Sequence, residues 1–227
     1  TRAREAREKK DAKVETPDIT ALSALTLTEN EGVTASELLL IGKGAVSVSE
    51  ASDGDEVTVS VKATPFHVEG GGQLGDIGYM IAPFGKIQIE NTKRLPEGTV
   101  YHVGTVTEGT VKVGDELTFE VAIERRNDMA RNHTATHLLH AALRKVLGDH
   151  VTQAGSLVTP DYLRFDFTHF ESVTAPQIAE VETLVNDEIL KASDLAVAEM
   201  SMDEAKAKGA MALFGEKYGD RVRVVEV

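Results

Sequence analysis

The sequence of 227 residues contains no cysteine, which excludes disulfide bonds and any zinc site with a cysteine ligand inside this chain. Long apolar runs are missing as well, and stretches such as Leu38–Ile41 are far too short for a transmembrane helix. There is also no apolar segment of the kind that forms the centre of a signal peptide. These absences predict a cytoplasmic protein with no membrane partner.

Positive charge is scarce too, since 24 Lys and Arg residues stand against 37 Asp and Glu residues, for a formal net charge of −13. Such a chain is poorly suited to bind nucleic acid mainly through phosphate contacts, although another domain could hold most of an RNA substrate. Basic residues gather in Thr1–Lys13, where interleaved acidic residues indicate a solvated helix face. Because the chain begins with Thr1 inside this charged run, we expect a piece of a longer protein.

The spacing of apolar residues along the sequence divides the chain into two parts. Between about 20 and 125, short alternating runs are separated by turn signals such as Asp53-Gly54, a pattern typical of a small β-barrel or sandwich. The runs lie at 45–49, 56–62, 86–90, 99–103 and 116–123. We therefore predict an α+β fold class, with a charged linker helix over residues 1–19, a β-barrel over residues 20–125 and an α+β core over residues 126–227.

The second part of the chain mixes helices and strands. Apolar residues at helical spacing within Leu138–Leu147 predict a helix over about 128–147 that ends at Gly148. Thr174 can cap a second helix, with Gln177 closing a capping box, and this helix should run to about residue 191. Strands are expected over 163–167, 195–200 and 221–227, with a short helix over 202–208.

The helix over 128–147 carries three histidines on one face, because His133 and His137 are one turn apart and His140 follows. Two imidazoles at this spacing can share a metal ion, but an isolated pair of this kind is more often an ordinary part of a helix. The two residues in the middle of the pair are Ala135 and Thr136, so the glutamate of a zinc protease is absent. Spacing alone leaves both interpretations of the pair open, and His140 is expected to pack or to form a hydrogen bond.

Several segments, in the right order, resemble the editing domain of alanyl-tRNA synthetase. Asn132-His-Thr-Ala-Thr-His-Leu-Leu-His140 is similar to the first metal-binding segment of that domain. The other matching segments are Thr64-Pro-Phe-His-Val-Glu-Gly-Gly-Gly-Gln-Leu-Gly-Asp76, Gln153-Ala-Gly-Ser-Leu-Val158, Leu163-Arg-Phe-Asp-Phe167 and Gly209-Ala-Met-Ala-Leu-Phe-Gly-Glu-Lys-Tyr-Gly-Asp220. The likeness extends over about residues 20–227.

The resemblance implies a translation-factor-like β-barrel followed by an α+β editing core similar to that of threonyl-tRNA synthetase. It implies hydrolysis of the ester that joins a wrong amino acid, serine or glycine, to tRNA(Ala) at a zinc-associated site. The partners would be this mischarged tRNA and the rest of the parent synthetase. No motif for ATP binding is identifiable in the chain, so ATP would act only in a separate aminoacylation domain.

The same resemblance assigns roles to particular residues. His133 and His137 would be zinc ligands, and the Thr136 hydroxyl is a candidate for placing the substrate or its water. Gln153 and Ser156 would line the pocket and hydrogen-bond the amino acid or the terminal ribose. A tRNA-binding role at the mouth of the site, or alternatively a tight barrel turn, is expected for Gly71, Gly72 and Gln73. Structural support is expected from Asp76, Arg164 and Asp166.

The zinc site of the resembling family takes two further ligands from a Cys-Gly-Gly-Thr-His segment, and this chain stops at Val227 without such a segment. Two protein ligands make a weak, open site, because zinc in proteins usually takes three or four. We therefore expect weak zinc binding and low or absent deacylase activity from this chain by itself. Two alternatives stay open: a free-standing trans-editing deacylase, and a non-catalytic RNA- or protein-binding module of the same fold.

Overall fold

The computed structural model describes residues 28–29, 32–96, 98–193, 196–208 and 221–226. The charged helix expected over residues 1–19 and the segment at 209–220 that resembles the editing domain lie outside the described residues. The chain divides into two compact units, the first formed by Thr1–Gly70 and Leu74–Arg125 and the second by Gly71–Gln73 and Arg126–Val227. Among the described residues, no helix combines the length and apolarity needed to cross a membrane.

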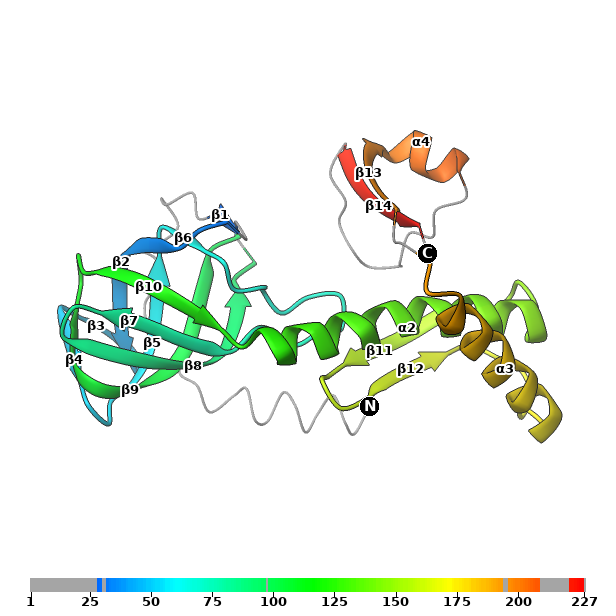
Figure 1. Ribbon diagram of the computed structural model, residues 1–227, viewed down its shortest axis with the longest axis horizontal. Helices are drawn as coiled ribbons and strands as arrows, with labels where there is room; N and C mark the ends of the chain where they lie inside the picture. Colours follow the sequence, from blue (N-terminus) through cyan, green and yellow to red (C-terminus); the bar gives the residue numbers. More distant parts are fainter. Residues whose placement is uncertain (1–27, 30–31, 97, 194–195, 209–220, 227) are drawn as a thin grey trace. The chain divides into compact units, whose positions relative to one another are not determined.

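The first unit is a closed β-barrel, drawn from blue to green in Figure 1. Its circle of strands runs β10-β7-β8-β9-β5-β2, and it closes because β10 pairs with β2 as well as with β7, in both cases antiparallel. The six strands are β2 (Ala35–Lys43), β5 (Glu56–Val61), β7 (Gly78–Ala82), β8 (Gly85–Arg94), β9 (Val100–Lys112) and β10 (Glu116–Val121). Two short strands are added to it: β3 (Val46–Val48) pairs with β2, and β4 (Glu50–Ser52) pairs with β9. A separate two-stranded parallel sheet is formed by β1 (Thr28–Glu29) and β6 (Ala63–Thr64).

Alternating side chains fill the barrel. In β8, Ile87 and Ile89 are buried while the alternate residues Gln88 and Glu90 are exposed, the pattern expected for a strand with one face on a core. The buried apolar residues of this core are Leu38, Ile41, Ala51, Val57, Val59, Val61, Phe66, Met80, Ala82, Ile87, Ile89, Val106, Val111 and Leu117. Burial of this apolar surface supplies the main driving force for closing the barrel.

The second unit contains a long helix, a hairpin and a second helix around one smaller core. Its elements are α2 (Ile123–Leu147), β11 (Gln153–Val158), β12 (Leu163–Phe167), α3 (Ala175–Lys191), β13 (Ala196–Ser201), α4 (Met202–Ala207) and β14 (Arg221–Glu226). The core has Ala142, Leu143, Val151 and Val181 at its centre. The predicted α+β fold class is confirmed: a closed six-stranded barrel is followed by helices and small sheets.

The ends of the two longer helices follow from their sequences. Gly148 follows α2 with φ at 114°, a conformation that glycine adopts without strain, and its N–H donates to the carbonyl of Arg144 at 2.9 Å. At the start of α3, the amide oxygen of Gln177 accepts hydrogen bonds from the N–H of Thr174 at 2.9 Å and from its hydroxyl at 2.8 Å. This is the half of a capping box that Gln177 was expected to form.

Candidate active site

The two candidate metal ligands lie one turn apart on α2. The ring centroids of His133 and His137 are 5.3 Å apart, and the rings are nearly parallel at 19°. Both side chains are partly buried. Burial lowers the pKa of His137 below its ordinary value of 6.5, and the neighbouring charge of His140 lowers it further. A lowered pKa keeps the His137 imidazole neutral at pH 7, with a lone pair able to bind a metal ion or accept a proton.

Gln73 contacts this histidine pair from a segment 60 residues earlier in the sequence. The amide oxygen Oε1 of Gln73 lies 2.7 Å from Nδ1 of His133, so the ring N–H can donate to it. Gln73 is 7% exposed and His133 is partly buried, so this hydrogen bond is partly shielded from solvent. Within the second compact unit, the short segment Gly71–Gln73 therefore supplies a polar group to α2.

The segment Gly71–Gln73 is held against β11 by its backbone. The N–H of Val158 donates to the carbonyl of Gly72 at 2.8 Å, and Gln73 forms a parallel bridge with Val158. Gly72 has φ at 85°, and a Cβ at this position would lie 2.8 Å from the carbonyl oxygen of Ser156. Both the conformation and the close approach require glycine here. Gly71 and Gly72 form a turn, and Gln73 after it bridges to Val158, so the choice between a structural turn and a tRNA-binding role stays a prediction.

A bulge in β11 determines which way its candidate pocket residues face. Gln153 pairs with Phe167 and Gly155 pairs with Asp166, so Ala154 is the extra residue of the bulge. Directly paired residues share a face of an antiparallel sheet, which places Gln153 and Ser156 on the face of Phe167 and Phe165. These phenylalanines pack on the core shared with α2 and α3. Gln153 and Ser156 thus lie on the sheet face that carries the helices.

Thr136 and Asn132 have their polar groups directed to the backbone. The Thr136 hydroxyl donates to the carbonyl of Asn132 at 2.9 Å, one turn back along α2, so its remaining capacity is as an acceptor. The amide of Asn132 donates to the carbonyls of Thr159 at 2.8 Å and Pro160 at 3.2 Å, in the turn between β11 and β12. No role was predicted for Asn132 from the sequence, although its place at the head of the histidine segment was a usable signal.

The remaining candidates have structural surroundings. His140 is buried, with its ring centroid 5.1 Å from that of Phe165, as expected for a packing residue. Arg164 and Asp166 form a half-exposed ion pair at 3.2 Å on the outer face of β12. Asp76 accepts a hydrogen bond from the N–H of His67 at 2.7 Å, which ties the two arms of the glycine-rich loop together. These contacts agree with supporting roles.

Two imidazoles are too few for a zinc site. His133 and His137 have the spacing and near-parallel rings that a shared metal ion allows, yet zinc in proteins usually has three or four protein ligands. Within the described part of the chain, no group of three or more His, Cys, Asp or Glu side chains could hold a metal ion. The described residues therefore do not complete a zinc site, and zinc binding stays a prediction.

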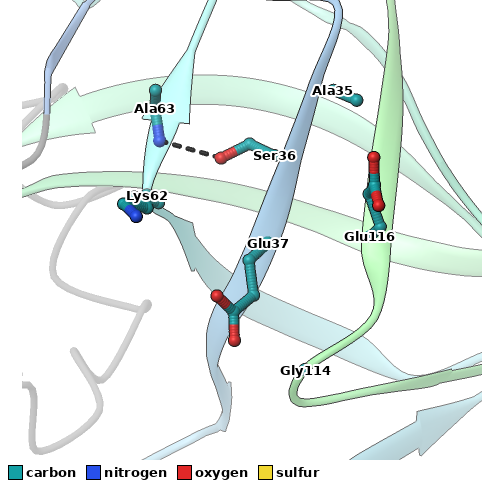
Figure 2. Close-up of a pocket in the computed structure, with 7 residues that line it drawn as sticks. All are labelled: Ala35, Ser36, Glu37, Lys62, Ala63, Gly114 and Glu116. Carbon is teal, nitrogen blue, oxygen red and sulfur yellow. Dashed lines mark hydrogen bonds between the residues drawn. The ribbon is translucent and has the colours of Figure 1, made fainter.

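A separate pocket lies on the barrel, and Figure 2 shows the side chains around it. Glu37 and Glu116 are direct cross-strand neighbours there, and Lys62 lies on the adjoining segment. The N–H of Ala63 donates to the hydroxyl of Ser36 at 2.9 Å across it. None of the candidate site residues named above lines this pocket, so the barrel pocket is distinct from the histidine site.

Known proteins share much of this sequence. Residues 1–125 match the family described as tRNA synthetases class II (A), and the chain belongs to this family. An alanine–tRNA ligase of Alkaliphilus oremlandii is 50% identical over 208 residues, which are 92% of this chain and 23% of that protein. An alanine–tRNA ligase of Acetivibrio thermocellus is 50% identical over 203 residues, 89% of this chain and again 23% of the relative. The chain thus spans less than a quarter of the length of these relatives.

Proposed function

We propose that this chain is the editing domain of an alanine–tRNA ligase and hydrolyses the ester bond of serine- or glycine-charged tRNA(Ala). The observation that carries the proposal is the meeting of three segments far apart in sequence. His133 hydrogen-bonds Gln73, and Gly72 packs on the backbone of Ser156. Each of these residues belongs to a segment that resembles the editing domain. The 50% identity to two alanine–tRNA ligases supports the same assignment.

The chemistry required is simple addition of water to an ester. Water adds to the acyl carbon, the bond from that carbon to the ribose oxygen breaks, and the ribose oxygen takes a proton. A neutral imidazole can accept the proton from the attacking water, and the lowered pKa of His137 favours the neutral form at pH 7. Ser156 and Gln153 can donate hydrogen bonds to the amino acid or the ribose from the face of the sheet that carries the helices.

A second site is needed because a pocket that activates alanine cannot strongly reject glycine or serine, which are close to alanine in size. Glycine is smaller by one methyl group, and a hydrophobic pocket rejects an added hydroxyl by only about 100-fold. A hydrolytic site can apply a different criterion, namely hydrogen bonds to the serine hydroxyl that alanine cannot form. The Thr136 hydroxyl donates its proton to the Asn132 carbonyl, so its oxygen is left as an acceptor suited to the serine hydroxyl.

The partners in this proposal are mischarged tRNA(Ala) and the rest of the synthetase, in the cytoplasm. The net charge of −13 means that most of the electrostatic attraction for tRNA would come from outside this chain. ATP would be consumed by the aminoacylation domain, which such a ligase carries separately.

The test is hydrolysis of serine-charged tRNA(Ala), measured with the 227-residue chain and with a full-length synthetase that contains it. We expect the full-length protein to release serine much faster than alanine, and His137→Ala to abolish the release. The matched control is His150→Ala, since His150 is an exposed histidine paired with His169 rather than with the site. A full-length protein that binds the charged tRNA but releases no serine would favour a binding module instead.

A further inference from the structure

The hydrogen bond between Gln73 and His133 has a consequence for the chemistry of the ring. A neutral imidazole carries one proton, on Nδ1 or on Nε2, and the hydrogen bond at one nitrogen decides which. The amide oxygen Oε1 of Gln73 can only accept, and it lies 2.7 Å from Nδ1 of His133. This contact favours the neutral ring that carries its proton on Nδ1.

The arrangement is built to keep this hydrogen bond in place. Gln73 is 7% exposed, so water competes little for its amide. Its neighbour Gly72 is bound to β11 through the Val158 N–H at 2.8 Å, with no room for a side chain beside Ser156. The backbone next to Gln73 is thus fixed, which limits the freedom of the amide to turn away.

The arms of the same loop are also held, inside the first unit. The N–H of Asp76 donates to the carbonyl of His67 at 2.9 Å, and the Asp76 carboxylate accepts from the His67 N–H at 2.7 Å. Further along, the N–H of Glu69 donates to the carbonyl of Thr92 at 2.8 Å.

We propose that Gln73 is a positioning residue, which fixes the Nδ1–H tautomer and the ring orientation of His133 in the candidate site. This inference rests on the proposed function for the identity of the reaction, but not for the tautomer itself. Polar groups that orient a functional histidine in this way typically contribute about 10- to 100-fold to affinity or activity. The glycine-rich segment, which by resemblance was expected at the tRNA end, thereby acts on the histidine itself.

The direct test is nitrogen-15 NMR of the histidine rings in the 227-residue chain, which distinguishes a protonated ring nitrogen from one with a lone pair. We expect His133 to carry its proton on Nδ1 in the unaltered chain. Gln73→Leu, which keeps the volume but removes the acceptor, should give a mixture of tautomers or a shift to Nε2–H. Gln73→Glu keeps an acceptor oxygen and should retain Nδ1–H. The ring of His102, buried in the barrel, serves as the control whose signals stay unchanged.

The kinetic counterpart uses the full-length synthetase and serine-charged tRNA(Ala). Gln73→Leu should lower kcat by about 10- to 100-fold with a much smaller change in KM, and Gln73→Glu should recover a large part of the loss. A His133 ring protonated on Nε2 in the unaltered chain would overturn the inference, and this measurement does not depend on whether any variant folds. An Nδ1–H ring in a protein that hydrolyses nothing would support the role of Gln73 on His133 and overturn the proposed function.

Discussion

Gly72 is the residue of the candidate site at which one added methyl group is expected to disturb the backbone most directly. Its φ is 85°, and a Cβ added to it would lie only 2.8 Å from the Ser156 carbonyl oxygen, which leaves no room for alanine. Gly72→Ala should lower the free energy of unfolding by about 1–3 kcal/mol, measured by urea denaturation. The substitution should also slow serine release, because the backbone must move away from Ser156 and would carry Gln73 away from His133.

Gly44 provides the matched control for this substitution. It also has positive φ, at 57°, but a Cβ there would meet nothing within 4 Å. Gly44→Ala therefore carries the conformational strain without the collision, and it should leave serine release unchanged. Equal effects of the two substitutions on serine release would mean that the contact between Gly72 and Ser156 is unimportant.

His102 makes the stability of the barrel depend on pH. Its side chain is fully buried, with Nδ1 3.0 Å from the Thr92 hydroxyl, and burial lowers its pKa from 6.5 to about 3. As the pH falls below about 6.5, His102 becomes protonated in the unfolded chain but stays neutral in the folded barrel until about pH 3. The free energy of unfolding should therefore fall through this window, by up to about 1.4 kcal/mol per pH unit, and its His102 contribution should be constant above it.

The measurement is urea unfolding at a series of pH values between 3 and 8, for the unaltered chain and for His102→Gln. Glutamine keeps a polar group near Thr92 but does not titrate, so the variant should lose much of the slope between about pH 6.5 and 3. Carboxylates contribute equally to both proteins and cancel in the comparison. Identical slopes would show that His102 is protonated as easily in the folded barrel as in the unfolded chain.

Local patterns in the sequence predicted part of the candidate site. The i, i+4 spacing of His133 and His137 correctly put them on one helix face, because helical geometry is local. The contact between Gln73 and His133 spans 60 residues, and no local pattern contains it. That contact depends on how the chain folds back, which only the three-dimensional arrangement determines.

At the scale of elements, the sequence predicted best where local signals were strong. The strand over 163–167 alternates regularly and was found at Leu163–Phe167, and the capped helix was found at Ala175–Lys191. Strand β2 was not predicted, because the run Leu38–Ile41 within it has no alternation and is largely buried. Helix α2 begins at Ile123 rather than near 128, since charged residues in its first turns hide the helical period.

The bulge in β11 is an element-scale feature with a functional prediction. Deletion of Ala154 would restore an unbroken ladder in which Gln153 stays opposite Phe167, on the face of the sheet that carries the helices. Because Gln153 keeps its face, the deletion should leave serine release within about tenfold, whereas Gln153→Ala should lower serine release by about 100-fold if Gln153 binds substrate.

The control for the deletion is Ala154→Ser, which changes an exposed side chain and keeps the bulge. It should release serine at the rate of the unaltered protein, and circular dichroism should give the same helix and strand content for both variants. A Gln153→Ala variant with full activity would exclude Gln153 from the site.

At the scale of the whole molecule, the number of metal ligands among the described residues is the feature that limits zinc binding. His133 and His137 are two donors, and the described residues supply no group of three. We expect zinc at about 100 μM to stabilise the 227-residue chain by no more than about 0.4 kcal/mol, the value for a dissociation constant of about 100 μM. Thermal unfolding with and without zinc measures this directly. A rise of several degrees that disappears in His133→Ala but not in His150→Ala would establish a complete zinc site.

The division of the molecule into a barrel and an α+β part was predictable because hydrophobic period changes from two to about 3.6 near residue 125. The assignment of Gly71–Gln73 to the second unit was not predictable in this way. A three-residue segment inside the barrel sequence carries no periodic signal. Its role depends on the backbone contacts of Gly72 and Gln73 with Val158 in β11.

The central claim is that Gln73, His133 and Ser156 surround one ester-binding site. The most direct test is an NMR titration of the 227-residue chain with a non-hydrolysable analogue, in which serine is joined by an amide bond to the terminal adenosine of tRNA. We predict that the backbone signals of these three residues shift together and saturate at one dissociation constant. Shifts confined to the barrel pocket around Glu37 and Glu116, with the signals of Gln73, His133 and Ser156 unchanged, would contradict the claim.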